Sequence, residues 1–170
     1  MSETSGAGPA WRELDSTACS IARTMAVIGE PWTVLVLRDL LNGIRRFDEL
    51  VDHLGIARNV LTRRLTTLVD AGLVETREYR EPGRRARREY RPTTAARDLR
   101  PVLLALMAFG DRHHAGPDGP PAAVEHDCGA PVTVQEVCAD GHVLGPRDRV
   151  RTVPGPGSRR RVDATAGGSG

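Results

Sequence analysis

Apolar residues between Gly43 and Val74 recur at helical spacing in two adjacent stretches. The first stretch places four of them at i, i+3, i+4 and i+7: Phe47, Leu50, Val51 and Leu54. The second stretch, after the turn at Gly55-Ile56, places three at the same kind of spacing before Gly72: Leu61, Leu65 and Leu68. Each spacing is typical of one buried face of an amphipathic helix. The pattern therefore predicts two helices joined by a tight glycine turn.

The outward face of the second helix carries long cations and short hydrogen-bonding side chains. These are Arg58, Asn59, Thr62, Arg63 and Thr66. Such side chains can reach base edges and phosphates in a major groove, which is wide enough for an α-helix. The pair of helices is therefore interpreted as a helix-turn-helix, with this face as its reading surface. A solvated amphipathic helix in an ordinary bundle is the alternative interpretation.

A basic hairpin is predicted directly after this pair of helices. Residues 73–79 and 87–91 are β-prone, and the segment 81–86 between them contains the turn formers Pro82 and Gly83. From Arg77 to Arg91 there are seven arginines against three glutamates, so the hairpin cannot be mainly core. We expect Arg84, Arg85 and Arg87 near its tip to contact phosphates or a narrow minor groove, and Arg45 and Arg46 to contact the flanking backbone. A solvated basic hairpin without a partner is the alternative.

Three further helices are expected around this module. Helices over 18–28 and 31–42 supply core, and a helix running from Thr93 or Thr94 to about His114 carries a long apolar stripe. That stripe consists of Leu99, Val102, Leu103, Leu106 and Met107. Pairing with the same helix (95–114) of a second copy, together with the N-terminal helix, would bury it and create a homodimer. Packing onto the N-terminal helix of the same chain is the alternative.

The net charge of +2 hides an uneven distribution. Residues 45–100 contain 14 basic and 9 acidic residues, an excess of five positive charges, while the remainder has an excess of three negative ones. The positive potential is therefore concentrated on the segment expected to face a polyanion. All 24 basic residues are arginine, for which a GC-rich genome is the favoured explanation.

The run from Cys19 to Gly110 resembles the HxlR-type winged helix-turn-helix regulators, relatives of the MarR group. The matching pieces, in chain order, are Cys19, IGEPWTVL (28–35), LRDLLNG (37–43), RRFDEL (45–50), Gly55-Ile56, LTRRL (61–65), GLV (72–74), YRPT (90–93) and LRPVL (99–103). The resemblance implies a mainly α fold with a small β-hairpin wing, acting as a dimeric DNA-binding transcription factor. One departure is Ala57, which stands where a helix-capping Ser is usual and offers no side-chain oxygen.

The same resemblance implies a regulatory signal. A cysteine at the place of Cys19 serves in some family members as a thiol sensor for electrophiles or oxidants. A small buried hydrophobe at the dimer seam is the favoured interpretation of Cys19, because its immediate neighbours Ala18, Ser20 and Ile21 supply no cation. A small apolar effector bound between the dimer helices and the DNA-binding domain is an equally open alternative.

The winged domain is expected to span residues 11–115, and three further parts lie outside it. Residues 1–10 and 158–170 are expected to be disordered, and residues 116–157 are expected to form a linker and a short ribbon-like β appendage. That appendage resembles the tail of some family members. It is interpreted as a metal-free hairpin (132–137 and 142–150), against a zinc site built from His126, Cys128, Cys138 and His142. No cofactor is expected to be required.

The sequence favours a regulator over other classes of protein. No stretch approaches the ~20 apolar residues that span a bilayer, and no export signal precedes the first helix, so the expected location is the bacterial cytoplasm, on the nucleoid. No constellation of nucleophile, base or phosphate loop suggests an enzyme. A homodimeric repressor that binds double-stranded DNA and responds to a small molecule or a thiol-reactive signal is the main interpretation. A winged-helix module for protein–protein interaction is the alternative.

Overall fold

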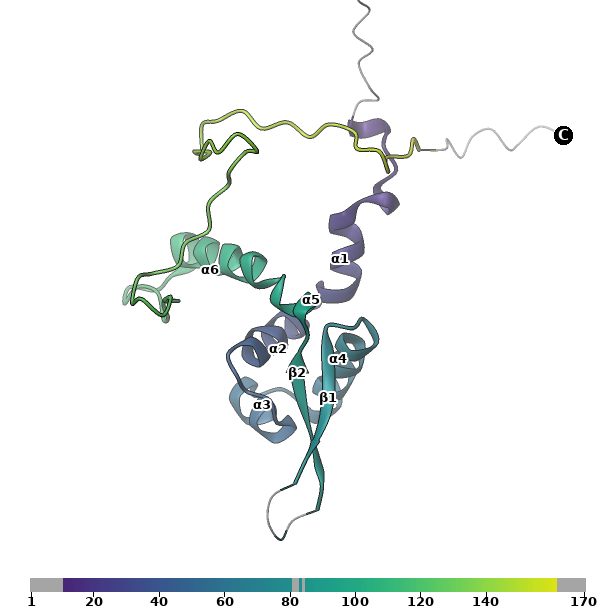
Figure 1. Cartoon of the computed structure of the whole chain (residues 1–170), viewed down its shortest axis with the longest axis vertical. Helices are drawn as coiled ribbons and strands as arrows, with labels where there is room; N and C mark the ends of the chain where they lie inside the picture. The colour runs from purple at the N-terminus through teal and green to yellow at the C-terminus, as the bar shows by residue number, and fades with distance from the viewer. Residues whose placement is uncertain (1–10, 81–82, 84, 162–170) are drawn as a thin grey trace, which may run out of the picture. The chain divides into compact units, whose positions relative to one another are not determined.

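The computed structural model describes residues 11–80, 83 and 85–161, and the chain divides into two units. The larger unit runs from Glu30 to Gly145, and the smaller one combines the described residues up to Gly29 with those from Pro146 onward. The larger unit contains α2 (Pro31–Leu41), α3 (Phe47–Leu54), α4 (Arg58–Asp70), β1 (Val74–Tyr79), β2 (Arg87–Pro92), α5 (Thr94–Arg97) and α6 (Arg100–His114) (Figure 1).

The core of the larger unit lies where α2, α3 and α4 meet the base of the hairpin. Both predicted stripes are found there, with the second buried more completely than the first. Leu61, Leu65 and Leu68 of α4 are at most 1% exposed, and Leu50 of α3 is fully buried. The other three residues of the first stripe, Phe47, Val51 and Leu54, are half-buried. From α2, the side chains of Val36, Leu37 and Leu40 complete this core.

A glycine makes the turn between α3 and α4. Gly55 ends α3 with φ of 61°, in the left-handed region that a residue with a Cβ adopts at a cost. The next residue, Ile56, is 3% exposed and anchors the turn in the core. Ala57 then begins α4 as its N-cap and makes no side-chain capping bond, as the sequence predicted.

The predicted wing is a two-stranded antiparallel hairpin. Val74 pairs with Pro92 at its base and Tyr79 pairs with Arg87 at the far end of the ladder. Thr93 fastens the base, because its hydroxyl donates to the carbonyl of Gly72 (2.8 Å) and its backbone N–H donates to the carbonyl of Leu73 (3.0 Å). The hairpin ladder projects beyond the helices that pack at its base (Figure 1).

The prediction of one helix from Thr93 or Thr94 to about His114 is wrong in one respect, because this stretch forms two helices. α5 ends at Arg97 and α6 begins at Arg100, with the break at Asp98 and Leu99. Pro101 is the physical reason: it has no N–H to donate to the carbonyl of Arg97, four residues earlier, so the ladder of helical hydrogen bonds is interrupted. None of the residues of α6 is buried within the chain.

The segment 116–145 departs further from the prediction. Among its residues, all of them described, the structure contains neither helix nor strand, so the strands expected at 132–137 and 142–150 are not formed. The segment instead contains short turns closed by isolated bridges, Gly116 with Gly119, Glu125 with Pro131 and Val137 with Val143. The bridge between Val137 and Val143 flanks the turn of the predicted hairpin. No side chain of this segment is buried, so it has no apolar face on which a longer ladder could form.

The smaller unit is built from two remote parts of the chain. Short 3₁₀ turns at Trp11–Glu13 and Ser16–Ala18 lead into α1 (Ser20–Ile28). The N–H of Asp15 donates to the carbonyl of Arg159 (2.8 Å), and the N–H of Arg161 donates to that of Glu13 (2.8 Å). Residues 158–161, the start of the tail expected to be disordered, are therefore hydrogen-bonded here. The rest of that tail and residues 1–10 lie outside the described residues.

No single described helix is long and apolar enough to cross a membrane. Only α1 and α2 counted together reach that length and composition.

Truncating the centre of the α4 stripe tests this account of the core. Leu65→Ala should lower the free energy of unfolding by about 2–5 kcal/mol, because it opens a cavity at a site that is 1% exposed. Urea denaturation followed by circular dichroism measures the change. The neighbouring exposed change Thr66→Ala is the control and should stay within about 0.5 kcal/mol. Equal effects of the two substitutions would contradict the assigned orientation of α4.

Candidate DNA-binding surface

The face of α4 opposite the leucine stripe points outward. Asn59, Thr62 and Arg63 are all exposed, as the sequence predicted. Thr62 donates its hydroxyl to the carbonyl of Arg58 (2.9 Å), and the side-chain oxygen of Asn59 accepts from the N–H of Val60 (2.9 Å). Arg63 makes no side-chain hydrogen bond or ion pair with the described residues, so its guanidinium is available to a ligand in front of the helix.

Arg58, at the first turn of α4, is held by two residues of α3. Its Nη2 lies 2.9 Å from Oδ1 of Asp48, and its guanidinium lies over the ring of Phe47, 4.9 Å from the ring centroid. Both the cation and the carboxylate are more than half exposed. A cation stacked on an aromatic ring and paired with a carboxylate has fewer accessible rotamers than a free arginine side chain. The structure thus presents Arg58 at the surface in a defined position.

The two arginines ahead of α3 lie beside the wing. The carbonyl of Arg45 accepts the N–H of Tyr90 (2.8 Å), and Arg46 forms an isolated bridge with Glu89 of β2. The guanidinium of Arg46 lies 4.6 Å from the centroid of the Tyr79 ring, on β1, and 3.8 Å from a carboxylate oxygen of Glu49. The backbone at these two arginines therefore lies alongside β2 and is hydrogen-bonded to it, so both residues lie beside the wing.

Of the three arginines expected at the wing tip, two can be placed. Arg85 is exposed and Arg84 lies outside the described residues. Arg87 starts β2, with its Nη1 3.9 Å from Oδ2 of Asp48. The carboxylate of Asp48 therefore lies between Arg58, at the first turn of α4, and Arg87, at the start of β2.

Sequence reasoning did not identify Asp48, Phe47 or Tyr79 as part of this surface. The two aromatic residues could have been predicted from the sequence to belong to it, because an aromatic ring beside an arginine-rich surface can stack with a guanidinium. No sequence signal shows that Asp48 meets Arg58 and Arg87, because the contact depends on how α3, α4 and the wing pack.

A second acidic residue of this region has a structural role. Asp39 of α2 is 1% exposed, and its carboxylate contacts Arg38 (2.8 Å) and Nδ1 of His53 at the end of α3 (2.7 Å). Its backbone carbonyl also accepts the N–H of Ile44 (3.0 Å). A buried carboxylate needs such partners, since an unpaired one is strongly destabilising. This contact fixes α3 against α2 and thereby the position of the helix-turn-helix.

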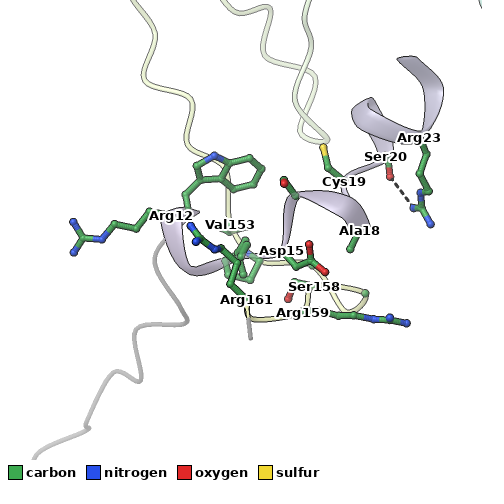
Figure 2. Close-up of a pocket in the computed structure, with 16 residues that line it drawn as sticks. Arg12, Asp15, Ala18, Cys19, Ser20, Arg23, Val153, Ser158, Arg159 and Arg161 are labelled. Atoms are coloured by element: carbon green, nitrogen blue, oxygen red, sulfur yellow. Dashed lines mark hydrogen bonds between the residues drawn. The ribbon is translucent and has the colours of Figure 1, made fainter. Parts of the chain in front are cut away.

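Cys19 belongs to the smaller unit. It is the N-cap of α1, half-buried, and lines a cavity of about 610 Å³ between the N-terminal turns and residues 153–161 (Figure 2). The sequence neighbours of Cys19 supply no cation, but four of the other residues that line the cavity are arginines: Arg12, Arg23, Arg159 and Arg161. The sequence does not predict that Arg12, Arg159 and Arg161 lie near Cys19. Arg12 belongs to a separate turn, and the other two lie at the opposite end of the chain.

The cavity also holds one carboxylate, that of Asp15. It accepts the backbone N–H of Thr17 (2.9 Å) and the hydroxyl of the same residue (2.8 Å). These hydrogen bonds, the backbone one first, hold the pKa of Asp15 below its usual range, and Arg159 and Arg161 act in the same direction. The lining of this cavity is therefore cationic on balance.

The four residues considered for zinc are brought together only in part. Sγ of Cys138 lies 3.4 Å from Nδ1 of His142, and the carboxylate of Asp140 joins them. Within the described part of the chain, this is the group of three or more metal-ligand side chains that the fold gathers, and it contains neither His126 nor Cys128.

The comparison with known proteins agrees with this geometry. The model of the HxlR-like helix-turn-helix family matches residues 27–117, which contain α2 to α6 and the wing. The chain belongs to the HxlR-like helix-turn-helix family.

Two kinds of relatives extend the likeness beyond that range. The chain is 37% identical over 145 residues to Rv3095 of Mycobacterium tuberculosis, described as an uncharacterized HTH-type transcriptional regulator, covering 84% of this chain and 90% of the relative. Among solved structures, PA1607 has a TM-score of 0.69 at 34% identity, covering 79% of this chain and 94% of that one. PA1374 of Pseudomonas aeruginosa has a TM-score of 0.57 at 42% identity, covering 81% and 93%.

The chain is therefore a DNA-binding transcriptional regulator with a winged helix-turn-helix, as the sequence predicted. The surface formed by α4, residues 45–46 and the wing has the charge and the exposed polar groups that DNA binding requires.

The contacts of Asp48 predict an unusual direction for a substitution in this surface. Asp48→Asn keeps the size of the side chain but removes a negative charge beside Arg58 and Arg87, so affinity for duplex DNA should rise about two- to fivefold. The slope of log K against log salt should steepen by less than about one unit. Fluorescence anisotropy at several salt concentrations measures both.

Asp70→Asn, at the far end of α4, is the matched control and should change neither quantity. Weaker binding by Asp48→Asn would contradict the electrostatic account and show that Asp48 mainly positions the two guanidinium groups.

Proposed function

We propose that the chain acts as a homodimeric repressor that binds a two-fold symmetric operator through this surface. The observation that carries the dimer is an apolar face on α6 that stays exposed among the described residues. Val102, Leu106 and Phe109 follow each other at i, i+4 and i+7 and are 44–58% exposed. Large apolar side chains gathered on one exposed helix face are typical of a surface that another chain covers. A second copy of α6 offers a face of the same chemistry, as a two-fold interface requires.

The N-terminal helix supports the same interpretation. Ile21 and Met25 of α1, one helical turn apart, are 73% and 51% exposed. A dimer that buries α1 and α6 of both copies would remove these side chains from water, which stabilises association by roughly 25 cal/mol per Å² of apolar surface.

A two-fold dimer dictates the form of the DNA site. Two copies of α4 would enter successive major grooves on one side of the duplex, with half-sites about one helical turn (~34 Å) apart. We propose repression, because a small dimer bound at a promoter acts most simply by excluding RNA polymerase. Such a protein acts where the bacterial chromosome is, by binding and without catalysis.

The arginine-lined cavity of the smaller unit is the proposed place for the signal. Cys19 is half-buried at the start of α1, so a change at its thiol would act on the helix that we assign to the dimer. The solved structure of the redox regulator HypR in its oxidized form is similar to this chain, with a TM-score of 0.52 at 26% identity, covering 58% of this chain. We propose a thiol-reactive or small-molecule signal at this cavity, where the four arginines favour an anionic molecule. A small apolar effector between the dimer helices and the DNA-binding domain stays the alternative.

A module that binds only proteins is the alternative function. It gives no reason for the exposed polar and cationic face of α4 or for the arginines gathered at the wing. DNA affinity that falls steeply with salt would separate the two functions, because counterion release accompanies each phosphate contact.

Arg63 is expected to read a base. Arg63→Ala should cost about 1–3 kcal/mol on the operator and relax the preference at one position in each half-site, because a bidentate contact with a guanine is lost. Selection from random duplexes, followed by affinity measurement on operator and random DNA, tests this. Equal losses on both kinds of DNA would show that Arg63 contacts only phosphate.

Arg64→Ala is the matched control for Arg63. This neighbouring arginine is 20% exposed, and its Nη2 lies 3.6 Å from a carboxylate oxygen of Glu30, the N-cap of α2. Its loss should leave the sequence preference unchanged.

Charge on the apolar face of α6 should abolish the dimer. Leu106→Glu places a carboxylate at the centre of the proposed interface, where it would be desolvated opposite its own symmetry mate, so the dimer dissociation constant should rise at least about a hundredfold. Analytical ultracentrifugation measures it. Ala108→Glu, on another face of α6, is the control and should remain dimeric. A dimeric Leu106→Glu variant with unchanged affinity would place the interface elsewhere.

A further inference from the structure

The turn from Cys138 to His142 brings three side chains of different chemistry close to one another. The Sγ of Cys138, a carboxylate oxygen of Asp140 and an imidazole nitrogen of His142 all lie within 4.8 Å of one another. We propose that these three residues bind a divalent transition-metal ion, with Zn²⁺ the ion that fits their chemistry.

The distance between the sulfur and nitrogen ligand atoms is close to that of a tetrahedral zinc site. Zinc–sulfur and zinc–nitrogen bonds of about 2.3 and 2.0 Å at a tetrahedral angle separate the two ligand atoms by about 3.5 Å. The Sγ of Cys138 and the Nδ1 of His142 are 3.4 Å apart. The spacing of these two atoms therefore suits a metal ion bound to both, and a carboxylate oxygen of Asp140 lies within 4.8 Å of each.

The backbone of the turn sets this arrangement. The N–H of Cys138 donates to the carbonyl of His142 (3.0 Å), and the N–H of Gly141 donates to that of Cys138 (2.9 Å). Gly141 has φ of 83°, which a residue with a Cβ adopts only under strain. Cys138 and His142 are thus opposite each other across the turn, where side chains lie on the same side, with Asp140 between them at its tip.

The surrounding segment has hydrogen-bonded turns but no buried apolar side chain to stabilise it. From Gly116 to Gly145 no side chain is buried, and Val137 and Val143, which close the turn, are 54% and 58% exposed. Isolated hairpins of this size are marginal at best in water. Small segments without a core are commonly held by a disulfide or a metal ion, and the cysteines of this chain are free. A metal ion would supply to this turn the constraint that a core supplies elsewhere.

The companion turn has the same backbone but not the same site. The N–H of His126 donates to the carbonyl of Ala130 (2.9 Å), and that of Gly129 donates to the carbonyl of His126 (2.8 Å), repeating the pattern twelve residues earlier. Nδ1 of His126, however, accepts the backbone N–H of Cys128 (3.2 Å). The assignment therefore replaces the four-residue zinc site considered from the sequence by a three-residue site with one open position.

The donor set selects the ion. A thiolate with an imidazole favours Zn²⁺ over Mg²⁺ or Ca²⁺, which prefer oxygen ligands. Three protein ligands leave the fourth tetrahedral position to water or to an incoming group.

Titration of the full-length protein with Zn²⁺, after treatment with a chelator and its removal, tests the proposal. Calorimetry should show one Zn²⁺ per chain, and Co²⁺ bound in its place should show a sulfur-to-metal charge-transfer absorption. Cys138→Ser and His142→Ala should each weaken Zn²⁺ binding by at least about tenfold, since loss even of an outer partner of a metal ligand costs that much. Cys128→Ser is the matched control and should bind as the wild type does. DNA affinity, measured on every variant, reports separately on the winged module.

Three results would overturn the assignment. One is the absence of stoichiometric Zn²⁺ binding by the wild type, and another is unchanged binding by Cys138→Ser or His142→Ala. The third is an equal loss in Cys128→Ser, which would show that both turns close around one ion.

Discussion

The burial of one face of α4 is the constraint on which the rest of the winged module depends. Leu61, Leu65 and Leu68 are at most 1% exposed, and burying each such side chain contributes about 1.5–3 kcal/mol. A helix with three buried leucines on one side cannot rotate about its axis without exposing them. The direction of Asn59, Thr62 and Arg63 is therefore decided by the core, although none of the three belongs to it.

Acidic residues act in two different ways beside this core. Asp39 is buried, and its contacts with Arg38 and His53 join α2 to α3, so its role is to hold the fold. Asp48 is exposed and pairs with Arg58 and Arg87. Exposed ion pairs contribute about 0–1 kcal/mol, so phosphate groups can replace Asp48 at a small cost. Asp48 thereby neutralises part of the charge of the two arginines while the surface is free and does not prevent their transfer to DNA.

Two parts of the chain beyond the helix-turn-helix and the wing, α6 and the segment after it, have little core of their own. α6 has no buried residue, and the segment from Gly116 to Gly145 has none either. Each of these parts has exposed groups that a partner could bind: α6 has an apolar stripe, and the segment after it has a cluster of metal-ligand side chains at Cys138. The module with a complete core binds DNA, while the parts without one are the places where we assign a second copy and a metal ion. This division has a physical basis, because a segment that cannot bury enough of its own surface gains most from a partner.

Local periodicity is what the sequence by itself determined. The leucine stripe of α4, the turn at Gly55 and the alternation that forms the wing depend on neighbours a few residues apart, so the helix-turn-helix, its reading face and the wing were predictable. The break before Pro101 was missed although its signal is local, since the apolar stripe continues across it. The prediction of strands from residue 132 onward is wrong, because a short hairpin needs an apolar surface to pack against and the composition does not show whether one is present. Only the tertiary structure decided that Asp48 lies between Arg58 and Arg87, that Arg45 and Arg46 lie along β2, and that arginines from both ends of the chain surround the cavity at Cys19. These contacts join residues far apart in sequence, and their formation depends on how whole elements pack against each other.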